Sequence, residues 1–448
     1  MSSSFQNRTL DAFDQLTAYL QTWASPDEGF TAYLQGEQTD FVRFNHGRIR
    51  QPGSVEQATL TLRWLNGRRH ASADLSLTGE LQEDKAQLHA TVETLRGWLA
   101  CLPEDPHLRL PETVTSSDQW ATEAAAPTAP MVQHIVDGST ALDLVGILAN
   151  GTMVRCFSNH MGQRNTFCRS GAHFDYSLYD PEGRAIKASL AGDRLTRDDL
   201  QDAFARGKRQ LDVLGRPKMS LKPGEYRSFL APAALEELFS LLSWGSFSGR
   251  EQATRQSGLM RLIDGATRFH TGLNLREDLT PGLAPAFQET GFPRPDVVPL
   301  IQGGQHVGGL VSPRTSAEHG LPGNGARASE SPTSLVLAGG DLPTAEAMPT
   351  LGTGLWVSNL WYLNWSDQAA GRVTGMTRFG TMWVEDGEPV APIEHMRFDD
   401  TLERMLGSSL ERLTREQSLL PSTSTYGQRS TDSMTLPGAL LSGFRLTL

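Results

Sequence analysis

Apolar residues in the first part of the chain switch between a helical and a strand-like spacing. Over residues 9–24 they recur every three or four positions until Ser25-Pro26, which predicts a helix. A leucine stripe predicts a second helix over 84–102. Between them, alternation of apolar and polar positions predicts strands over 30–35, 40–44, 57–65 and 70–77. Gly36, His46-Gly47 and Asn66-Gly67 supply the expected turns between these strands.

The pattern continues after an exposed connector over 110–130. It predicts a short helix over 131–137, strands near 142–148, 153–158, 165–169, 174–179 and 185–191, and a helix from about 195 to 214. Residues 216–224 are rich in Pro, Lys and Gly, and we place a domain boundary there. We therefore expect an N-terminal domain over 1–220 and a C-terminal domain over 221–448.

The second half is dominated by short strand-like runs separated by glycine and proline. A strand over 226–230 precedes a helix that Pro232 opens, and a second, amphipathic helix is predicted over 401–417. Asp386-Gly387 predicts the turn of a hairpin over 381–393. The predicted fold class is α+β, with N-terminal helices on a mixed β-sheet and a mostly antiparallel C-terminal β domain.

Composition narrows the classes of function. A length of 448 residues suits two domains, and a net charge of −11 with a pI near 5.5 argues against a nucleic-acid-binding surface. Three cysteines without a CxxC pair suit a reducing compartment. The chain shows no secretory signal pattern and no uncharged run of membrane-spanning length, so we expect a cytoplasmic protein without membrane or nucleic-acid partners.

Residues 352–398 hold the highest density of aromatic residues, interspersed with polar ones. Core strands and the lining of a groove both explain this composition. The runs GLWVSNL (354–360) and RVTGMTRFGTMWVEDGEPVAPI (372–393) resemble the C-terminal signature of the TldD/PmbA family, and FVRFNHGRIRQ (41–51) resembles its early hairpin. The order and spacing of these motifs make the resemblance strong.

The resemblance has consequences for metal chemistry. The TldD members of the family hold zinc with a His-Glu-x-x-x-His helix and a late cysteine. The equivalent helix here, 232–242, contains Glu236 and Glu237 but no histidine, and no cysteine follows Cys168. The resemblance therefore implies a TldE-like member without catalytic or metal-binding residues of its own, and a zinc ion in a TldD-type partner.

The resemblance also implies a partner and a substrate. Such a chain pairs with a TldD-type catalytic subunit in a heterodimer or larger assembly that cleaves unfolded peptides, and it contributes groove wall and dimer interface. A homodimer is left open. Segment 311–340 resembles the family's central groove, and the polar residues of 352–398 lie among aromatic ones. The candidate peptide-binding residues are Asn324, Arg327, Asn359, Asn364, Arg372, Thr374 and Arg378.

Two other functions fit the residues. A stand-alone hydrolase would use different groups, such as Ser246 or Ser248 in the GxSxG run 245–249, or a carboxylate near Glu236. We interpret that run as a flexible loop, because a helix precedes it and a strongly polar segment follows. A non-enzymatic peptide-binding protein is the third possibility.

Overall fold

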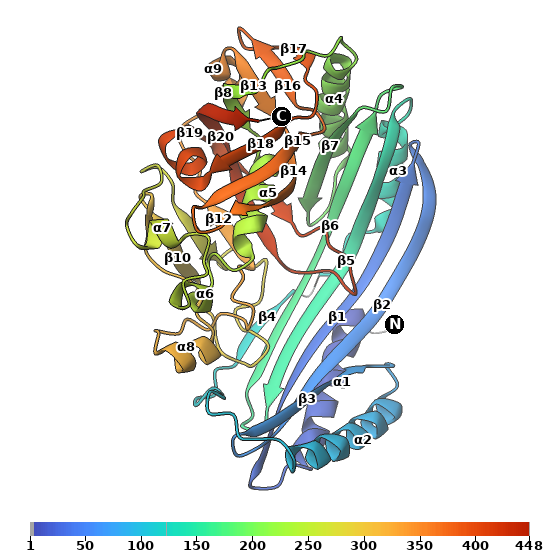
Figure 1. Ribbon diagram of the computed structural model, residues 1–448. Helices are drawn as coiled ribbons and strands as arrows, with labels where there is room; N and C mark the ends of the chain where they lie inside the picture. Colours follow the sequence, from blue (N-terminus) through green and yellow to red (C-terminus); the bar gives the residue numbers. More distant parts are fainter. Residues whose placement is uncertain (1–3, 122, 448) are drawn as a thin grey trace.

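Two β-sheets organise the chain (Figure 1). The structure is a computed structural model and describes residues 4–121 and 123–447. The first sheet has seven strands in the order β3-β2-β1-β5-β6-β4, with β7 on the free side of part of β6. Its strands are β1 (Glu28–Asn45), β2 (Arg48–Asn66), β3 (Arg69–Ser76), β4 (Ser117–Trp120), β5 (Asp143–Asn159), β6 (Arg164–Tyr179) and β7 (Ala185–Gly192).

The strands of this sheet are longer than the sequence predicts. The pairs 30–35 with 40–44, 142–148 with 153–158, and 165–169 with 174–179 each form one continuous strand, so the predicted breaks are wrong. Glycine inside the strands misled the prediction. A Cβ at Gly151 would lie 2.0 Å from the Gln38 carbonyl oxygen, so this glycine permits close approach of β1 to β5. The turns at His46-Gly47 and Asn66-Gly67 are confirmed.

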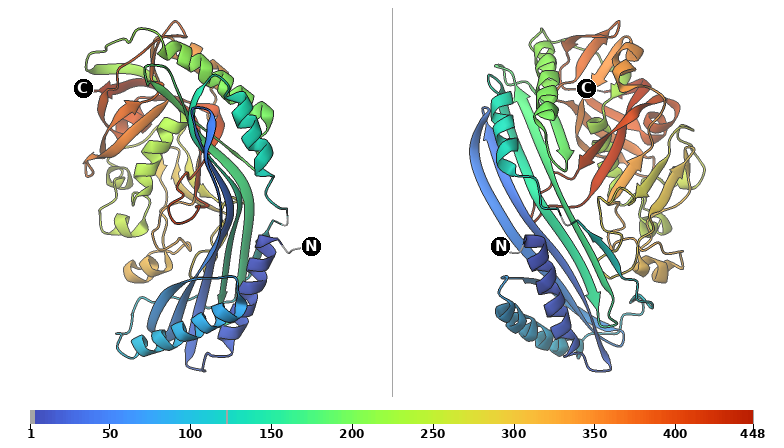
Figure 2. Two further views of the ribbon diagram at one scale, coloured as in Figure 1. Left: turned by 90° about the vertical axis from the view of Figure 1, so that its right-hand side faces the viewer. Right: turned by 180° about the vertical axis from the view of Figure 1, so that it is seen from behind.

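Four helices cover one face of this sheet (Figure 2). Helices α1 (Phe5–Gln21) and α2 (Leu81–Leu99) pack over one end in a cluster that includes Phe30 and Leu34 of β1. Helices α3 (Thr128–Gly138) and α4 (Arg197–Leu214) pack over the other end with Val42 and Phe44 of the same strand. The long strands therefore run beneath two separate apolar clusters.

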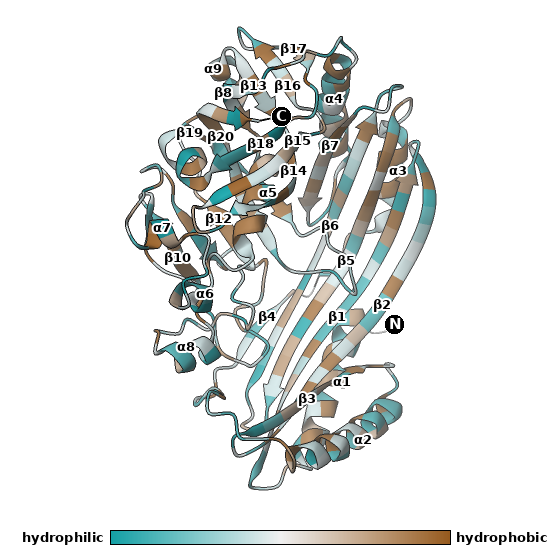
Figure 3. Cartoon of the chain, viewed as in Figure 1, coloured by the Kyte–Doolittle hydropathy of each residue, from teal (hydrophilic) through white to brown (hydrophobic). Residues whose placement is uncertain are grey.

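The opposite face of the sheet is turned toward the C-terminal half of the chain (Figures 1 and 2). Polar and apolar positions alternate along the long strands, as the hydropathy colours of Figure 3 show. Glu37 and Arg155 lie on this face and are almost fully buried. Such burial requires polar partners, and a C-terminal loop supplies several of them.

The second sheet has thirteen strands and is mostly antiparallel, with β12–β20 and β8–β13 as its parallel pairs. Helix α5 (Pro232–Ser243) packs into its apolar core. The strands are β8 (Gly224–Leu230), β9 (Leu275–Asp278), β10 (Val297–Gln302), β11 (Gln305–His306), β12 (Ser334–Leu337), β13 (Gly354–Val357), β14 (Asn359–Asp367), β15 (Arg372–Arg378), β16 (Met382–Glu385), β17 (Glu388–Pro392), β18 (Arg397–Thr401), β19 (Leu410–Pro421) and β20 (Ser433–Leu446).

Short helices connect these strands. They are α6 (Gly249–Ala253), α7 (Met260–Ile263), α8 (Pro313–His319), η1 (Thr344–Glu346), α9 (Ala347–Leu351) and the π-helical turn η2 (Arg404–Ser408). No helix in residues 4–121 and 123–447 is long and apolar enough to cross a bilayer.

The α+β class and the hairpin over 381–393 are confirmed, whereas the helix predicted over 401–417 is wrong. Its place is taken by the turn η2 and by β19, which pairs with β20. Leu410, Leu413 and Leu420 are buried in that strand, and their spacing also fits a helix. Pairing with a neighbouring strand overrode the local pattern. The domain boundary near 216–224 stays a prediction.

Candidate functional site

A groove of about 770 Å³ lies between the two sheets. Strands β6 and β7 and helix α4 form one wall, and helix α5 with the ends of β12, β14, β19 and β20 forms the other. No histidine or cysteine is among its described lining residues. Its polar and aromatic lining includes Asp175, Tyr176, Lys187, Ser189, Arg206, Glu236, Glu237, Trp244, Arg327, Ser358, Asn359 and Asp432.

Helix α5 presents two different faces. Pro232 starts the helix, and Leu235, Leu238 and Leu242 are buried in the core of the second sheet. The groove-facing side carries Glu236 and Glu237 and leads to Trp244 just beyond the helix end. Trp244 is 84% exposed, an unusual position for so large an apolar side chain.

Glu236 and Glu237 are half-buried and have neither a hydrogen-bond donor nor an ion-pair partner among the described residues. Burial, reinforced by the neighbouring Glu237, raises the pKa of Glu236 to about 7. Burial also raises the pKa of Glu237, although Lys187 opposes the shift. Lys187 forms an ion pair with Asp175, because its Nζ lies 3.6 Å from Asp175 Oδ2.

Several buried polar atoms of the groove also lack partners among the described residues. They are the Tyr176 hydroxyl, Asn359 Oδ1, Ser189 Oγ and Ser358 Oγ. Buried polar atoms in folded proteins are almost always satisfied by protein, water or ligand. The groove therefore offers unused hydrogen-bonding capacity to an occupant.

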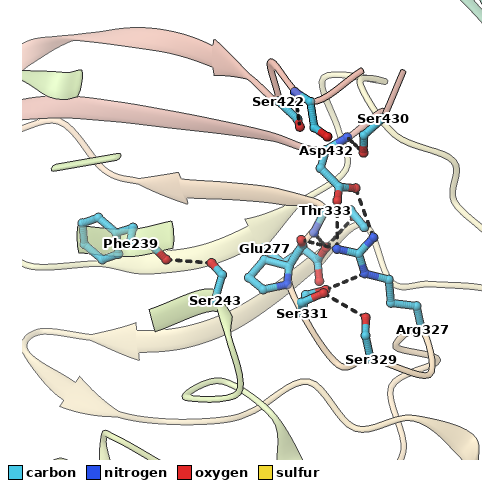
Figure 4. A network of polar contacts seen from close by, with 12 residues as sticks. Phe239, Ser243, Glu277, Arg327, Ser329, Ser331, Thr333, Ser422, Ser430 and Asp432 are labelled. Carbon is cyan, nitrogen blue, oxygen red and sulfur yellow. Dashed lines mark hydrogen bonds and ion pairs between the residues drawn. The ribbon is translucent and has the colours of Figure 1, made fainter. Parts of the chain in front are cut away.

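Arg327 lines the groove and is held in a network of polar contacts (Figure 4). Its two Nη atoms donate to the two carboxylate oxygens of Asp432 at 3.2 and 3.0 Å, and its Nε donates to the Ser331 carbonyl at 3.0 Å. A bidentate pair of this kind fixes the guanidinium in place. Arg327 thus joins the loop before β12 to the start of β20.

Comparisons with known proteins bear on this architecture. Residues 223–447 match the family model described as the PmbA/TldA metallopeptidase C-terminal domain, which is about half of the chain. The chain belongs to the TldD/PmbA family. No curated protein matches it by sequence.

Solved structures of TldD/PmbA type match the whole chain. TldE from Thermococcus kodakarensis aligns with a TM-score of 0.78 at 16% identity, covering 98% of this chain and 100% of that one. A proposed DNA gyrase modulator from Thermotoga maritima aligns with a TM-score of 0.72 at 11% identity, over 98% and 100% of the two chains. A similar protein from Bacteroides thetaiotaomicron gives 0.72 at 13% identity, over 98% of each. These likenesses establish a shared fold.

The seven candidate peptide-binding residues separate into those that line the groove and those that do not. Arg327 and Asn359 line the groove. Asn324 instead holds its own loop, because its Oδ1 accepts from the Val311 N–H and its Nδ2 donates to the Gly309 carbonyl.

The other four candidates lie along β14 and β15 and do not line the groove. Arg372 pairs with Asp399 at 2.9 Å, and the Thr374 hydroxyl donates to the Phe398 carbonyl. Arg378 stacks over the Trp361 ring, with the guanidinium carbon 3.9 Å from the ring centre. Asn364 accepts a hydrogen bond from the following backbone N–H.

The groove also contains residues that sequence reasoning did not select as binding residues. Tyr176, Lys187, Arg206 and Trp244 come from four separate elements. The one available signal was the Glu236-Glu237 pair inside an otherwise apolar helix. A charged pair on a buried helix is expensive to desolvate unless the surroundings or a ligand compensate for it.

Zinc is the metal that the TldD/PmbA family implies. The lining provides carboxylates, hydroxyls and amides, whereas zinc in proteins is held mainly by imidazole and thiolate with some carboxylate. No cluster of three or more His, Cys, Asp or Glu residues suited to a metal occurs in residues 4–121 and 123–447. These donors do not fit a zinc site.

The serine loop has a structural role. Ser248 is 1% exposed, its hydroxyl donates to Glu330 Oε2 at 2.6 Å, and it accepts from the Glu251 N–H at the start of α6. Burial alone would raise the pKa of Glu330, but hydrogen bonds from Arg250, Ser248 and others lower it overall. The expected flexible loop is instead a buried helix cap.

Proposed function

We propose that this chain is the TldE-like subunit of a cytoplasmic TldD/TldE-type zinc peptidase that acts on unfolded peptides. In this proposal it contributes groove wall and dimer interface, and a TldD-type partner holds the zinc and performs the cleavage. The proposal is supported chiefly by helix α5, which faces the groove with two carboxylates where the zinc-holding helix of a TldD member carries histidines.

The walls of the groove suit an extended peptide. Strand β7 pairs only with β6 among the described strands, and five consecutive β7 residues, 186–190, line the groove. An unpaired strand edge offers backbone N–H and C=O groups to which an extended chain can add. The exposed Trp244 provides an apolar contact at the mouth.

The decisive experiment compares the pure chain with the chain reconstituted with a TldD-type protein. Cleavage of an unstructured peptide is followed by mass spectrometry, with and without a chelator. We expect chelator-sensitive cleavage by the pair, little by the TldD-type protein alone, and none by this chain alone. Strong chelator-sensitive cleavage by the pure chain would refute the proposed role.

A further inference from the structure

The charged lining of the groove has an acidic excess of one side chain, with Asp175, Glu236, Glu237 and Asp432 set against Lys187, Arg206 and Arg327. The charged residues facing Glu236 and Glu237 come from β6, β7, α4 and the loops at the ends of β12 and β20. Asp175 pairs with Lys187, and Arg327 pairs with Asp432. Arg206 is exposed on α4, and no ion pair joins it to either glutamate in the described structure.

Two further lining side chains, one from each wall of the groove and each more than nine-tenths buried, have polar atoms that lack hydrogen-bond partners among the described residues. Asn359 is 7% exposed and its Oδ1 has no donor; Tyr176 is 2% exposed and its hydroxyl has no partner among the described residues. An amide oxygen can only accept a hydrogen bond, and a hydroxyl oxygen accepts as readily as it donates. Both atoms therefore suit a ligand that brings N–H groups.

An organic cation matches these demands better than a metal ion does. Adjacent residues on a helix project about 100° apart, so Glu236 and Glu237 cannot both chelate one small ion without further ligands. An ammonium or guanidinium group carries three to five N–H donors, so it can use carboxylate, amide or hydroxyl oxygens as acceptors without the fixed geometry that a metal ion requires.

We propose that the groove selects peptides that place a protonated amine or guanidinium against Glu236 and Glu237, with Asn359 and Tyr176 as additional hydrogen-bonding partners. This inference rests on the proposed peptide-binding function and names its ligand class. A lysine or arginine side chain and a free peptide amino terminus share this chemistry.

The pH dependence of binding should follow from the same geometry. Because the pKa of Glu236 is raised to about 7, this carboxyl is partly protonated at neutral pH and gains charge above it. Lys187 and the Arg327–Asp432 pair face the same space. Affinity for a lysine-containing peptide should therefore increase between about pH 6 and about pH 8, whereas binding through a free amino terminus, whose own pKa is about 8, should peak near neutral pH.

The test measures binding of fluorescent, unstructured peptides to the full chain by anisotropy. The peptide series holds one lysine or a norleucine in its place, each with a free or an acetylated amino terminus. We expect cationic peptides to bind about tenfold more tightly than the fully neutral one. The lysine and amino-terminal arms identify which source supplies the charge.

Glu236→Gln combined with Glu237→Gln should abolish this preference and its pH dependence while neutral-peptide affinity is retained. Glu346→Gln, an exposed carboxylate on η1, is the control for the loss of a negative charge. Equal affinity for neutral and cationic peptides would overturn the proposed preference for a cation but would remain consistent with peptide binding in the groove. Binding of neither peptide would overturn both.

Discussion

The backbone N–H of Arg429 donates to Glu37 Oε2 at 3.3 Å, which ties the loop between β19 and β20 to the middle of β1. Two further bonds fasten the same loop. Arg155 donates to the Arg429 carbonyl at 3.1 Å, and Arg429 Nη2 donates to the Gly171 carbonyl at 3.2 Å. The side chains of Glu37, Arg155 and Arg429 are all at least nine-tenths buried, so the contact between the two halves of the chain contains three desolvated charged groups held by hydrogen bonds to backbone atoms.

Arg429→Met should destabilise the protein by about 1–2 kcal/mol, because it removes the hydrogen bond from the buried guanidinium to the Gly171 carbonyl and the attraction of that guanidinium to Glu37, while both backbone hydrogen bonds remain. Burial lowers the pKa of Arg429 to about 10, so the side chain remains charged at neutral pH. Urea denaturation and protease cleavage within loop 422–432 provide the two measurements. Arg109→Met, in an exposed loop, is the control. An unchanged denaturation midpoint would contradict the assigned role.

Glu236→Gln should change how stability depends on pH. The pKa of the folded-state carboxyl is raised from 4.5 to about 7, so the stability that Glu236 contributes is present below pH 4.5 and lost as pH rises through 7. The variant avoids this loss. Its free energy of unfolding relative to the unmutated protein should increase over that window by about 1–2 kcal/mol, after allowance for solvent screening of a half-exposed group. A difference that is constant from pH 4 to pH 8 would show that the carboxyl is not desolvated.

Ser248→Ala should reduce stability without affecting peptide cleavage by the reconstituted pair. The hydroxyl caps α6 and donates to Glu330, and losing such a cap costs about 1–2 kcal/mol. Thermal unfolding and the cleavage assay are measured side by side, with Ser76→Ala at an exposed position as the control. Loss of cleavage by a fully folded variant would instead favour a serine hydrolase.

Trp244→Ala should weaken peptide binding with little effect on thermal stability. The side chain is 84% exposed and therefore has little burial to lose, while it stands at the mouth of the groove. Aromatic anchors at binding sites typically contribute more than 1 kcal/mol, which predicts an affinity loss of about tenfold. Tyr426→Ala, which removes an aromatic ring that is 98% exposed outside the groove lining, is the matched control. Equal affinities of the two variants would exclude Trp244 from the site.

Local sequence signals predicted much of the fold. Pro232 marked the start of α5, and Asp386-Gly387 marked the hairpin of β16 and β17. Errors arose where a residue served a distant contact. Gly151 permits β1 and β5 to approach closely, and the leucines of β19 gain their burial from strand pairing.

The candidate site was less accessible to sequence reasoning because its walls come from elements far apart in the chain. Tyr176 and Asn359 both line the groove, and no spacing rule connects them. Arg372 and Thr374 were predicted to bind peptide because they are polar residues among aromatic ones. Their polar atoms are already paired within their own sheet. Polarity identifies residues that need partners, and only the folded chain shows which of them still lack one.

The uninterrupted strands beneath the two helix pairs have a mechanical consequence. β1 and β5 remain in one hydrogen-bonding register from Thr31 opposite Asn159 to Phe44 opposite Gly146. A slip of one residue at either end would reverse inward and outward side chains along the entire ladder. The α1–α2 end and the α3–α4 end should therefore unfold together in a single cooperative transition, because both depend on the same pair of strands.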